Sequence, residues 1–359
     1  MGEKLRGCLL GGAVGDALGA PVEFLSIAEI KARFGPDGIQ DYAPAYGRLG
    51  AITDDTQMTL FTAEGLLRAY VRAGTRGMVS VTSVVSHAYL RWLWTQGIQS
   101  ETKPQPEQVR GWLWGIKELH SQRAPGRTCI SAVKAFTNLT DRRADNDSKG
   151  AGGIMRVAPV AMMFAGQPDE TREVFHLGME TAWLTHGHPS GFLSAAAFAV
   201  ILHAVLCNEP LVEGIDRARQ CLSHEEGHEE CVAALDKAVS LAGGDLAHEA
   251  AIGQLGEAWV GEEALGIAVY CTLKASNFQH GVLMAINHDG DSDTTGSLVG
   301  QLLGAFYGEA GIPERWLTPL EIRDTIMQLA SDIEQHWRWN LDFMSDSYDA
   351  GVVERYPGG

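Results

Sequence analysis

The sequence predicts an all-α protein, and three observations support this fold class. Strand-like and helix-like segments do not alternate along the chain of 359 residues, and no internal repeat of about 20–50 residues is present. Apolar residues instead recur at helical spacing in the long segments. Two segments carry glycine at every fourth position, which places these glycines on one helix face. We expect a single compact multi-helix domain over residues 1–359, with a core at about 5–310 and a helical tail at 311–359.

The glycine-striped segments lie near opposite ends of the chain, and their glycines are Gly7, Gly11, Gly15 and Gly19 in the first and Gly296, Gly300, Gly304 and Gly308 in the second. Each glycine costs a helix about 1 kcal/mol relative to alanine, so a stripe of four needs a reason. The close approach of another backbone is the reason we favour. Two buried helices are therefore expected, which could pack against each other. Pro21 ends the first helix and places Glu23 just beyond it.

Further helices are expected in chain order at 26–34, 53–72, 79–94, 107–121, 128–139, 190–207 and 213–241. A loop rich in glycine and proline, which reaches Gly50, separates the first two. The segment 190–207 carries no formal charge and approaches the length that spans a bilayer, but it stands alone and is rich in alanine. A buried core helix is expected there rather than a membrane span. The charged segment 213–241 is expected at the periphery.

Composition and charge argue against some kinds of partner and location. The formal net charge of −17 argues against nucleic acid, because a protein must neutralise phosphates to bind it. The same charge suits a protein that collects cations, although solubility explains it equally well. The six cysteines have no framework spacing, which predicts reduced thiols in a cytoplasm. We expect neither a secretory signal nor a membrane anchor from the first residues.

Two acidic turns are the strongest candidates for a functional site. They read Thr53-Asp54-Asp55-Thr56, before an expected helix, and Asp291-Ser292-Asp293-Thr294, before the second glycine-striped helix. Taken singly, each is more often a helix cap or a polar turn than a metal site, since acidic groups favour a helix N-terminus. If the turns meet, adjacent carboxylates at roughly 4 Å repel by about 4 kcal/mol per pair at an effective dielectric of about 20. Two divalent cations such as Mg²⁺ would balance them, so together the turns predict a shared two-metal site.

A glycine loop is the next candidate, with the sequence Ser148-Lys149-Gly150-Ala151-Gly152-Gly153-Ile154-Met155-Arg156. Its amide hydrogens can face an anion, so a phosphate cradle is one interpretation. Glycine loops are common, so an ordinary turn is the other. His186 and His188 precede the alanine-rich helix and could be general bases, metal ligands or capping groups, with a structural role as the default.

Another metal-like pattern consists of Cys221, His224, His228 and Cys231, whose spacing places them on one face of a helix. Zinc accepts two cysteines and two histidines as ligands. Four ligands on one straight helix cannot readily close a tetrahedron, however. We therefore favour a surface helix over a structural zinc site.

With these features together, the chain resembles the ADP-ribosylglycohydrolase family. The matching pieces occur in family order over about 300 residues and read G-C-L-L-G-G-A-V-G-D-A-L-G-A-P-V-E-F, I-T-D-D-T, S-K-G-A-G-G-I-M-R-V-A-P, T-H-G-H-P and N-H-D-G-D-S-D-T-T-G. Several separated motifs in one order make the resemblance specific. It implies an all-α fold with a binuclear Mg²⁺ or Mn²⁺ centre.

The resemblance also implies roles for the residues that match the family motifs. The metal ligands would be Thr53, Asp54, Asp55, Asp291, Asp293 and Thr294, the catalytic carboxylates Glu23 and Asp55, and the ADP-ribose contacts Ser148, Gly150, Gly152, Met155, Arg156, His186 and Gly290. The glycine loop would hold the diphosphate, while Asp55 or Glu23 would activate water or relay a proton.

This chain departs from the family pattern at three places. Some relatives carry an aspartate, proposed as a general base, just before a D-x-G-N-T motif, whereas residues 124–128 here read A-P-G-R-T. Either another acid does that work or the substrate differs. Ala151 stands where some relatives have asparagine or cysteine. The segment 75–125 is longer than in compact members and could shape the substrate entrance.

The expected function is metal-dependent hydrolysis of the glycosidic bond between ADP-ribose and a modified protein side chain, with arginine favoured. The alternatives are another linkage, such as serine-linked or O-acetyl-ADP-ribose, a two-metal enzyme that cleaves a phosphoanhydride, and a non-catalytic ADP-ribose binder. Retention of both acidic pairs disfavours the binder. The expected partner is an ADP-ribosylated protein or a small ADP-ribose conjugate, and neither nucleic acid nor a membrane is expected.

Overall fold

The computed structural model describes residues 1–101, 111–136 and 143–358, and within these ranges it confirms the all-α fold class. The described residues form α-helices and short 3₁₀ turns, and β-pairing among them is limited to two isolated bridges. One large cluster of buried apolar side chains, contributed by helices from both ends of the chain, forms the core.

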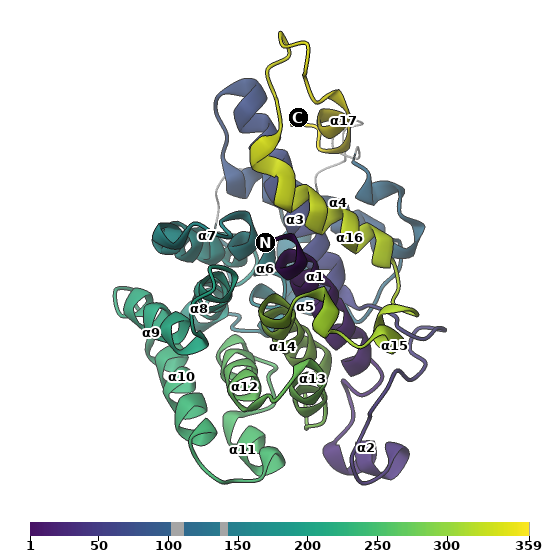
Figure 1. The fold of residues 1–359 in the computed structure, drawn as a ribbon, viewed down its shortest axis with the longest axis vertical. Coiled ribbons are helices and arrows are strands. Elements are labelled where there is room, and N and C mark those ends of the chain that lie inside the picture. The colour runs from purple at the N-terminus through teal and green to yellow at the C-terminus, as the bar shows by residue number, and fades with distance from the viewer. Residues whose placement is uncertain (102–110, 137–142, 359) are drawn as a thin grey trace.

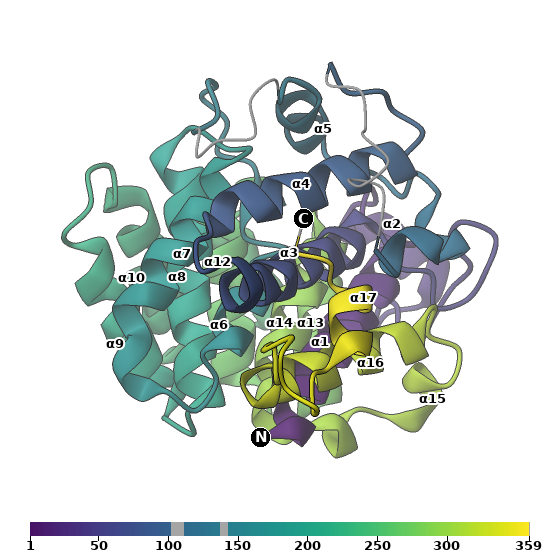
Figure 2. The ribbon, with the colours of Figure 1, turned by 90° about the horizontal axis from the view of Figure 1, so that it is seen from above.

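The helices occur in the order α1 Gly2–Gly19, α2 Ile27–Phe34, α3 Asp54–Arg76, α4 Val81–Thr95, α5 Arg127–Lys134, α6 Ala158–Met163, α7 Thr171–Trp183, α8 Pro189–Leu206, α9 Leu211–Leu222, α10 Glu229–Ala242, α11 His248–Leu255, α12 Gly261–Lys274, α13 Phe278–Ile286, α14 Ser292–Tyr307, α15 Glu314–Leu317, α16 Arg323–Gln335 and α17 Ala350–Arg355. In Figure 1, α1 and α14 lie centrally, with α7–α10 on one side and α2 and α15 on the other. Figure 2 shows the same separation from above.

The central contact joins α1 and α14, which run antiparallel with their glycine stripes facing each other. A Cβ atom added at Gly11 would overlap the backbone of Gly300, and one added at Gly7 would overlap that of Gly304. A Cβ atom added at Gly300 would in turn overlap the backbone of Gly11, and one added at Gly304 that of Gly7. Only residues without a side chain allow two helix backbones to lie this close. The expected packing of the two striped helices is therefore confirmed.

Several other expected helices are present with shifted ends. Ser26 and Glu29 form a capping box at the start of α2. Thr53 is the N-cap of α3, which continues to Arg76. By length and composition α8 is the one described helix that could cross a membrane, but 94% of it is buried inside the protein. The expectation of a core helix at 190–207 is thus confirmed.

The helix predicted at 107–121 is wrong where the chain is described. Residues 111–121 form 3₁₀ turns at Leu113–Gly115 and Lys117–Leu119, and the first part of the segment lies outside the described residues. Gly111 has a φ of +138°, which an α-helix does not accommodate.

The single helix predicted at 213–241 is also wrong, because α9 and α10 are separated by a turn. Gly227 in that turn has a φ of +77°, which ends helical geometry. Similarly, α5 ends at Lys134, whereas the predicted helix continued to residue 139, and residues 137–142 lie outside the described chain.

The C-terminal tail folds back onto the core. The Tyr356 hydroxyl donates a hydrogen bond of 2.6 Å to Asp332 on α16. Arg68 on α3 donates to the carbonyl of Pro357 at 3.0 Å. Arg68 also lies 3.8 Å from the buried carboxylate of Glu64, which pairs with Arg91 on α4 at 2.7 Å. The tail is therefore anchored to the helix that carries the first acidic turn.

We predict that Gly300→Ala destabilises the protein by about 3 kcal/mol or more, at the upper end of overpacking costs. The added methyl group meets the backbone of α1, and neither helix can move without separating the whole stripe. Gly253→Ala in α11 is the matched control, since nothing lies within 4 Å of its added methyl group, and alanine favours a helix by about 1 kcal/mol. Urea unfolding followed by circular dichroism compares the variants, and equal stabilities would contradict the close α1–α14 contact.

Candidate metal centre

The α1–α14 contact brings the two acidic turns to one place. Gly19, at the end of α1, lies against the backbone of Ser292 and Asp293 at the start of α14. The start of α3 is tied to the same end of α1, because the Thr53 N–H lies 3.0 Å from both carboxylate oxygens of Asp16. The turns at 53–56 and 291–294 are therefore neighbours in the folded chain.

Asp16 is a site residue that the sequence reading missed. Its fully buried carboxylate accepts hydrogen bonds from the backbone N–H groups of Thr53 and Thr56, the latter at 3.1 Å, and from the Thr56 hydroxyl. Burial and the negative charge of Asp293 raise the pKa of Asp16 to about 7, against the effect of these hydrogen bonds. The available signal was an acidic residue inside an otherwise apolar, glycine-striped helix. Asp16 orients the first turn of α3.

Six carboxyl groups gather at this place, each at most 8% exposed, and they belong to Asp16, Glu23, Asp54, Asp55, Asp291 and Asp293. We call them the acidic cluster. Oxygens of Glu23, Asp291 and Asp293 lie within 4.8 Å of one another. Burial raises the pKa of Asp55, and the negative charge of Asp293 raises it further. The two acidic turns thus share one electrostatic environment.

The acidic cluster contains oxygens that lack partners. Burial, followed by the charges of Asp293 and Asp291, raises the pKa of Glu23 to about 11. Oε2 of Glu23 and Oδ1 of Asp55 are buried without a hydrogen-bond partner. A buried, unpartnered carboxylate oxygen is costly. Oxygen-only donors of this kind fit a hard divalent cation, whose charge would also offset the repulsion.

Asp54 faces the segment in which this chain departs from the family pattern. Its N–H donates to the carbonyl of Arg123 at 3.0 Å, and its carboxylate accepts from the N–H of Gly126 at 3.1 Å. Residues 124–128 therefore lie against the acidic cluster without contributing a carboxylate.

The glycine loop is fixed to both helices that begin with acidic turns. The Met155 carbonyl accepts from Thr59 on α3 at 3.3 Å and from Gln301 on α14 at 3.4 Å. Ser148 and Thr128 share a hydrogen bond of 2.9 Å between their hydroxyls. The loop therefore lies beside the acidic cluster, with its first residue next to α5.

Gly150 and Gly152 serve the loop in different ways. Gly150 forms an isolated bridge with Val260 before α12. A Cβ atom added at Gly152 would lie 2.6 Å from the Cys129 sulfur and 3.1 Å from the His186 ring. The loop therefore packs directly onto buried side chains, and glycine permits that approach.

Arg156, the last residue of the loop, and His186, whose ring lies against the loop, are almost fully buried. The Arg156 guanidinium donates to the Tyr89 hydroxyl at 2.9 Å, the Thr185 hydroxyl at 2.6 Å and the Thr181 carbonyl at 3.2 Å. Burial, followed by the charge of Arg156, lowers the pKa of His186 to about 3, so its imidazole is neutral at pH 7. Arg156 thus supports the loop from inside the protein.

Gly290 sets the direction of the second acidic turn. Its φ is +112°, and a Cβ atom there would overlap the carbonyl oxygen of Glu257. That carbonyl accepts a hydrogen bond of 2.8 Å from the N–H of Asp291. Glycine is required at this position by the close backbone contact.

The Cys221, His224, His228 and Cys231 pattern does not form a metal site in the described chain. Cys221 belongs to α9, Cys231 belongs to α10, and the histidines lie in the turn between them. Among the described residues, the only His, Cys, Asp and Glu side chains grouped closely enough to share a metal are Glu23, Asp291 and Asp293.

His188 has a structural position. Its Nδ1 accepts a hydrogen bond of 3.1 Å from the N–H of Ser190, which caps the start of α8. The default interpretation of a capping role therefore agrees with its contacts, whereas His186 lies against the glycine loop.

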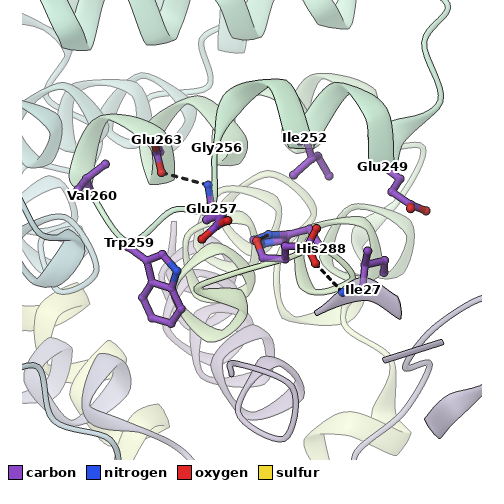
Figure 3. A pocket seen from close by; sticks show the side chains of 11 residues that line it. Ile27, Glu249, Ile252, Gly256, Glu257, Trp259, Val260, Glu263 and His288 are labelled. Atoms are coloured by element: carbon purple, nitrogen blue, oxygen red, sulfur yellow. Dashed lines mark hydrogen bonds between the residues drawn. The ribbon is translucent and has the colours of Figure 1, made fainter. Parts of the chain in front are cut away.

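A pocket of about 470 Å³ opens beside the turn that carries Asp291 (Figure 3). His288, Asp289 and Trp259 contribute to its walls. Asp289 accepts a hydrogen bond of 2.7 Å from the N–H of Ile27, drawn in Figure 3, which ties the start of α2 to this turn. Trp259 stacks on the exposed ring of Phe24 with centroids 5.9 Å apart. These contacts help to hold the segment that carries Glu23 next to the second acidic turn.

Fold and site together define an all-helical protein with a buried, oxygen-rich cluster suited to divalent cations beside a glycine loop. The sequence model of the ADP-ribosylglycohydrolase family matches residues 1–342, and the chain belongs to this family. The prediction of an ADP-ribosyl hydrolase is confirmed at the level of the family.

Curated relatives cover nearly the whole chain. An uncharacterized protein of Archaeoglobus fulgidus is 28% identical over 94% of this chain and 98% of its own length. The ADP-ribosyl-[dinitrogen reductase] glycohydrolase of Rhodospirillum rubrum is 24% identical over 89% of this chain and 91% of its own length. The ADP-ribosylarginine hydrolase Tri1 of Serratia proteamaculans is 24% identical over 92% of this chain and 79% of its own length.

A solved structure shares the fold. It is described as an ADP-ribosylglycohydrolase-related protein complex and matches with a TM-score of 0.66 at 24% identity, covering 93% of this chain and 98% of that chain. At this identity, the likeness supports the fold alone.

We predict that Asp293→Asn raises the stability of the protein in EDTA by about 1 kcal/mol or more, because one charge leaves a repulsive cluster. In the wild type, the Thr294 N–H donates to the Asp293 carboxylate at 3.0 Å. The side-chain carbonyl of the Asn variant can accept the same hydrogen bond. The same change should remove most of the stabilisation that excess Mg²⁺ or Mn²⁺ gives the wild type. Thermal unfolding with and without metal measures both effects.

Asp169→Asn, at an exposed position, is the control. A less stable Asp293 variant with an unchanged metal response would contradict a repulsive cation site.

Asp16→Ala should have the opposite effect in EDTA, although it also removes one negative charge. The N–H groups of Thr53 and Thr56 would lose a buried charged acceptor, which costs about 2–3 kcal/mol. Urea unfolding measures the loss. A variant as stable as the wild type would show that Asp16 does not hold the start of α3.

Proposed function

We propose that the protein releases ADP-ribose from ADP-ribosylated arginine with the aid of two divalent cations, Mg²⁺ or Mn²⁺. The observation that carries this proposal is the acidic cluster, in which two distant turns place buried, partly unpartnered carboxylates beside the glycine loop. A family member with an oxygen-rich cluster of this kind has the donors that such cations need.

The residues that would hold the cations are Thr53, Asp54, Asp55, Asp291, Asp293 and Thr294, all buried and all in the two acidic turns. Two cations would neutralise the four aspartates, with the threonine oxygens as uncharged donors. Bound there, they would supply Lewis acidity and orient the hydroxyls of the ribose next to the scissile bond.

Glu23 and Asp55 are the proposed catalytic carboxylates. Cleavage of an N-glycosidic bond builds positive charge on the ribose, and the leaving group needs a proton. Glu23 lies in the turn after α1, outside the two acidic turns, and its carboxylate comes within 4.8 Å of oxygens of Asp291 and Asp293 in the second turn. Since burial and negative neighbours favour its protonated form, Glu23 is suited to hold a proton for transfer. Water would attack the ribose carbon as the glycosidic bond breaks, and Asp55 has a buried, unpartnered oxygen that would accept the proton of that water.

The glycine loop is proposed to hold the diphosphate through its backbone N–H groups and the Ser148 hydroxyl. Gly150, Gly152 and Met155 would shape this cradle, with Gly290 at its border with the second acidic turn. His186 would contribute a neutral ring rather than a charge, because its pKa is lowered to about 3. Arg156 would act indirectly, since its guanidinium is bonded to Tyr89, Thr181 and Thr185.

The relative Tri1 is named an ADP-ribosylarginine hydrolase, and this supports arginine as the acceptor. Relatives named ADP-ribosylhydrolase ARH3, a name that specifies no acceptor, also match. Serine-linked and O-acetyl conjugates are therefore kept in the test as the alternative linkages. A cytoplasmic location agrees with six free cysteines among the described residues, and it stays a prediction.

The test is incubation with arginine- and serine-ADP-ribosylated peptides and with O-acetyl-ADP-ribose, in Mg²⁺, Mn²⁺ or EDTA. We expect free ADP-ribose from the arginine peptide in metal and at least a hundredfold lower rate in EDTA, since loss of metal Lewis acidity removes several kcal/mol. Asp293→Ala and Asp55→Ala should lose turnover while remaining folded. Release of AMP and ribose phosphate would contradict glycosidic cleavage, and wild-type turnover by either variant in EDTA would contradict the metal centre.

A further inference from the structure

A strained hairpin tip at residues 45–48 lies near the acidic cluster and has no part in the function proposed above. Ala45 and Arg48 exchange two backbone hydrogen bonds of 3.0 Å. Between them, Tyr46 and Gly47 have φ values of +48° and +83°. Two positive φ values in a two-residue loop are typical of a type I′ turn, in which glycine and asparagine are favoured. Because Tyr46 has a side chain, its positive φ is a strained backbone conformation, and such strain is found at functional sites.

The tip is fixed next to the first acidic turn through Arg123. The Arg123 guanidinium lies 4.9 Å from the centroid of the Tyr46 ring. Arg123 and Arg48 each donate to the buried carboxylate of Glu321 at 3.2 Å. The carbonyl of Arg123 accepts the N–H of Asp54 at 3.0 Å. A single residue therefore contacts both the Tyr46 ring and the turn that carries Asp54.

Tyr46 is close to the acidic cluster and still accessible. Tyr46 is 44% exposed, although the Arg123 guanidinium covers part of its ring. Burial, followed by the negative charges of Glu23 and Asp293, raises the pKa of the phenol above its ordinary value. The phenol therefore stays neutral, and it is close enough to the acidic cluster to interact with the charges of Glu23 and Asp293.

The tip and the glycine loop approach the acidic cluster from different sides. Lys149 in the loop pairs with Glu230 on α10 at 2.9 Å and with Glu262 on α12 at 2.5 Å. The tip is held instead by Glu321, between α15 and α16. Figures 1 and 2 place α10 and α12 on one side of α14 and α15 on the other. In the proposed binding mode, with the diphosphate on the loop and the distal ribose at the cluster, the group attached to that ribose would face the side of the cluster on which the tip lies.

We propose that the accessible part of the Tyr46 ring receives the guanidinium of the ADP-ribosylated arginine, so that Tyr46 is a specificity-determining residue. This inference rests on the proposed function and names the residue that recognises the acceptor. A planar guanidinium stacks favourably on a tyrosine ring, and the contact with Arg123 shows this pairing at the same ring. A serine-linked or O-acetyl conjugate has no planar cation to place there.

The experiment compares wild type, Tyr46→Gly, Tyr46→Phe and Leu49→Ala in the metal-loaded full chain. Glycine adopts the φ of this position without strain, so Tyr46→Gly is expected to fold. Two quantities are measured: kcat/KM on an ADP-ribosylarginine peptide, and the Kd of free ADP-ribose. Leu49→Ala is the loop control, since Leu49 is 48% exposed in the same loop.

We expect Tyr46→Gly to lower kcat/KM about tenfold, the size of one cation–π contact, while the Kd of ADP-ribose stays within about twofold. Tyr46→Phe keeps the ring and should recover most of the loss. An unchanged kcat/KM in Tyr46→Gly, or an equal loss of ADP-ribose affinity, would overturn the inference. If the wild type releases no ADP-ribose from the arginine peptide, the proposed function fails and the inference fails with it. If the wild type is active, the Tyr46 variants test the inference alone and leave the proposed function standing.

Discussion

The close backbone contact between α1 and α14 is the constraint on which the rest of the structure depends. Glycines face glycines along both helices, so that two segments from opposite ends of the chain become one central pair. At one end of this pair, Gly19 lies against the start of α14. That contact places Glu23 next to Asp291 and Asp293, and bulkier residues along the stripe would separate them.

The acidic cluster shows how a fold can hold groups that repel one another. Burial and mutual repulsion raise the pKa values of Glu23, Asp55 and Asp291, so the cluster opposes folding in the absence of a compensating charge. The buried apolar core and the bonds of Asp16 to Thr53 and Thr56 keep the groups together. Divalent cations would convert this cost into binding energy, which explains in physical terms why such a cluster belongs to a metal-dependent site.

Much of this arrangement could be predicted from the sequence, because its signals are local. The four-residue spacing of glycine predicts a close helix contact, and the repulsion between aspartates indicates that Asp54, Asp55, Asp291 and Asp293 need cations if they meet. Asp16 was missed because a lone acid in an apolar helix marks an unusual position but does not identify the N–H groups from which it accepts hydrogen bonds. The helix expected at 107–121 failed because apolar spacing does not reveal the φ of Gly111.

Other features depend on contacts that no local pattern encodes. Arg156 was predicted to contact ADP-ribose, yet its partners in the structure are Tyr89, Thr181 and Thr185. Tyr46 attracts attention only when its backbone conformation and its contact with Arg123 are known. The sequence therefore indicates candidate chemical groups better than it indicates the residues that position them.

We propose that carboxylates from both acidic turns form one centre for two cations. Electron paramagnetic resonance of the Mn²⁺-saturated protein tests it most directly, because two metals in a shared carboxylate site lie about 3.5–4 Å apart. At that separation the two Mn²⁺ ions are spin-coupled, and we expect the broad spectrum of a coupled pair with two ions bound per chain. The spectrum of isolated Mn²⁺ ions at saturation would contradict the shared centre.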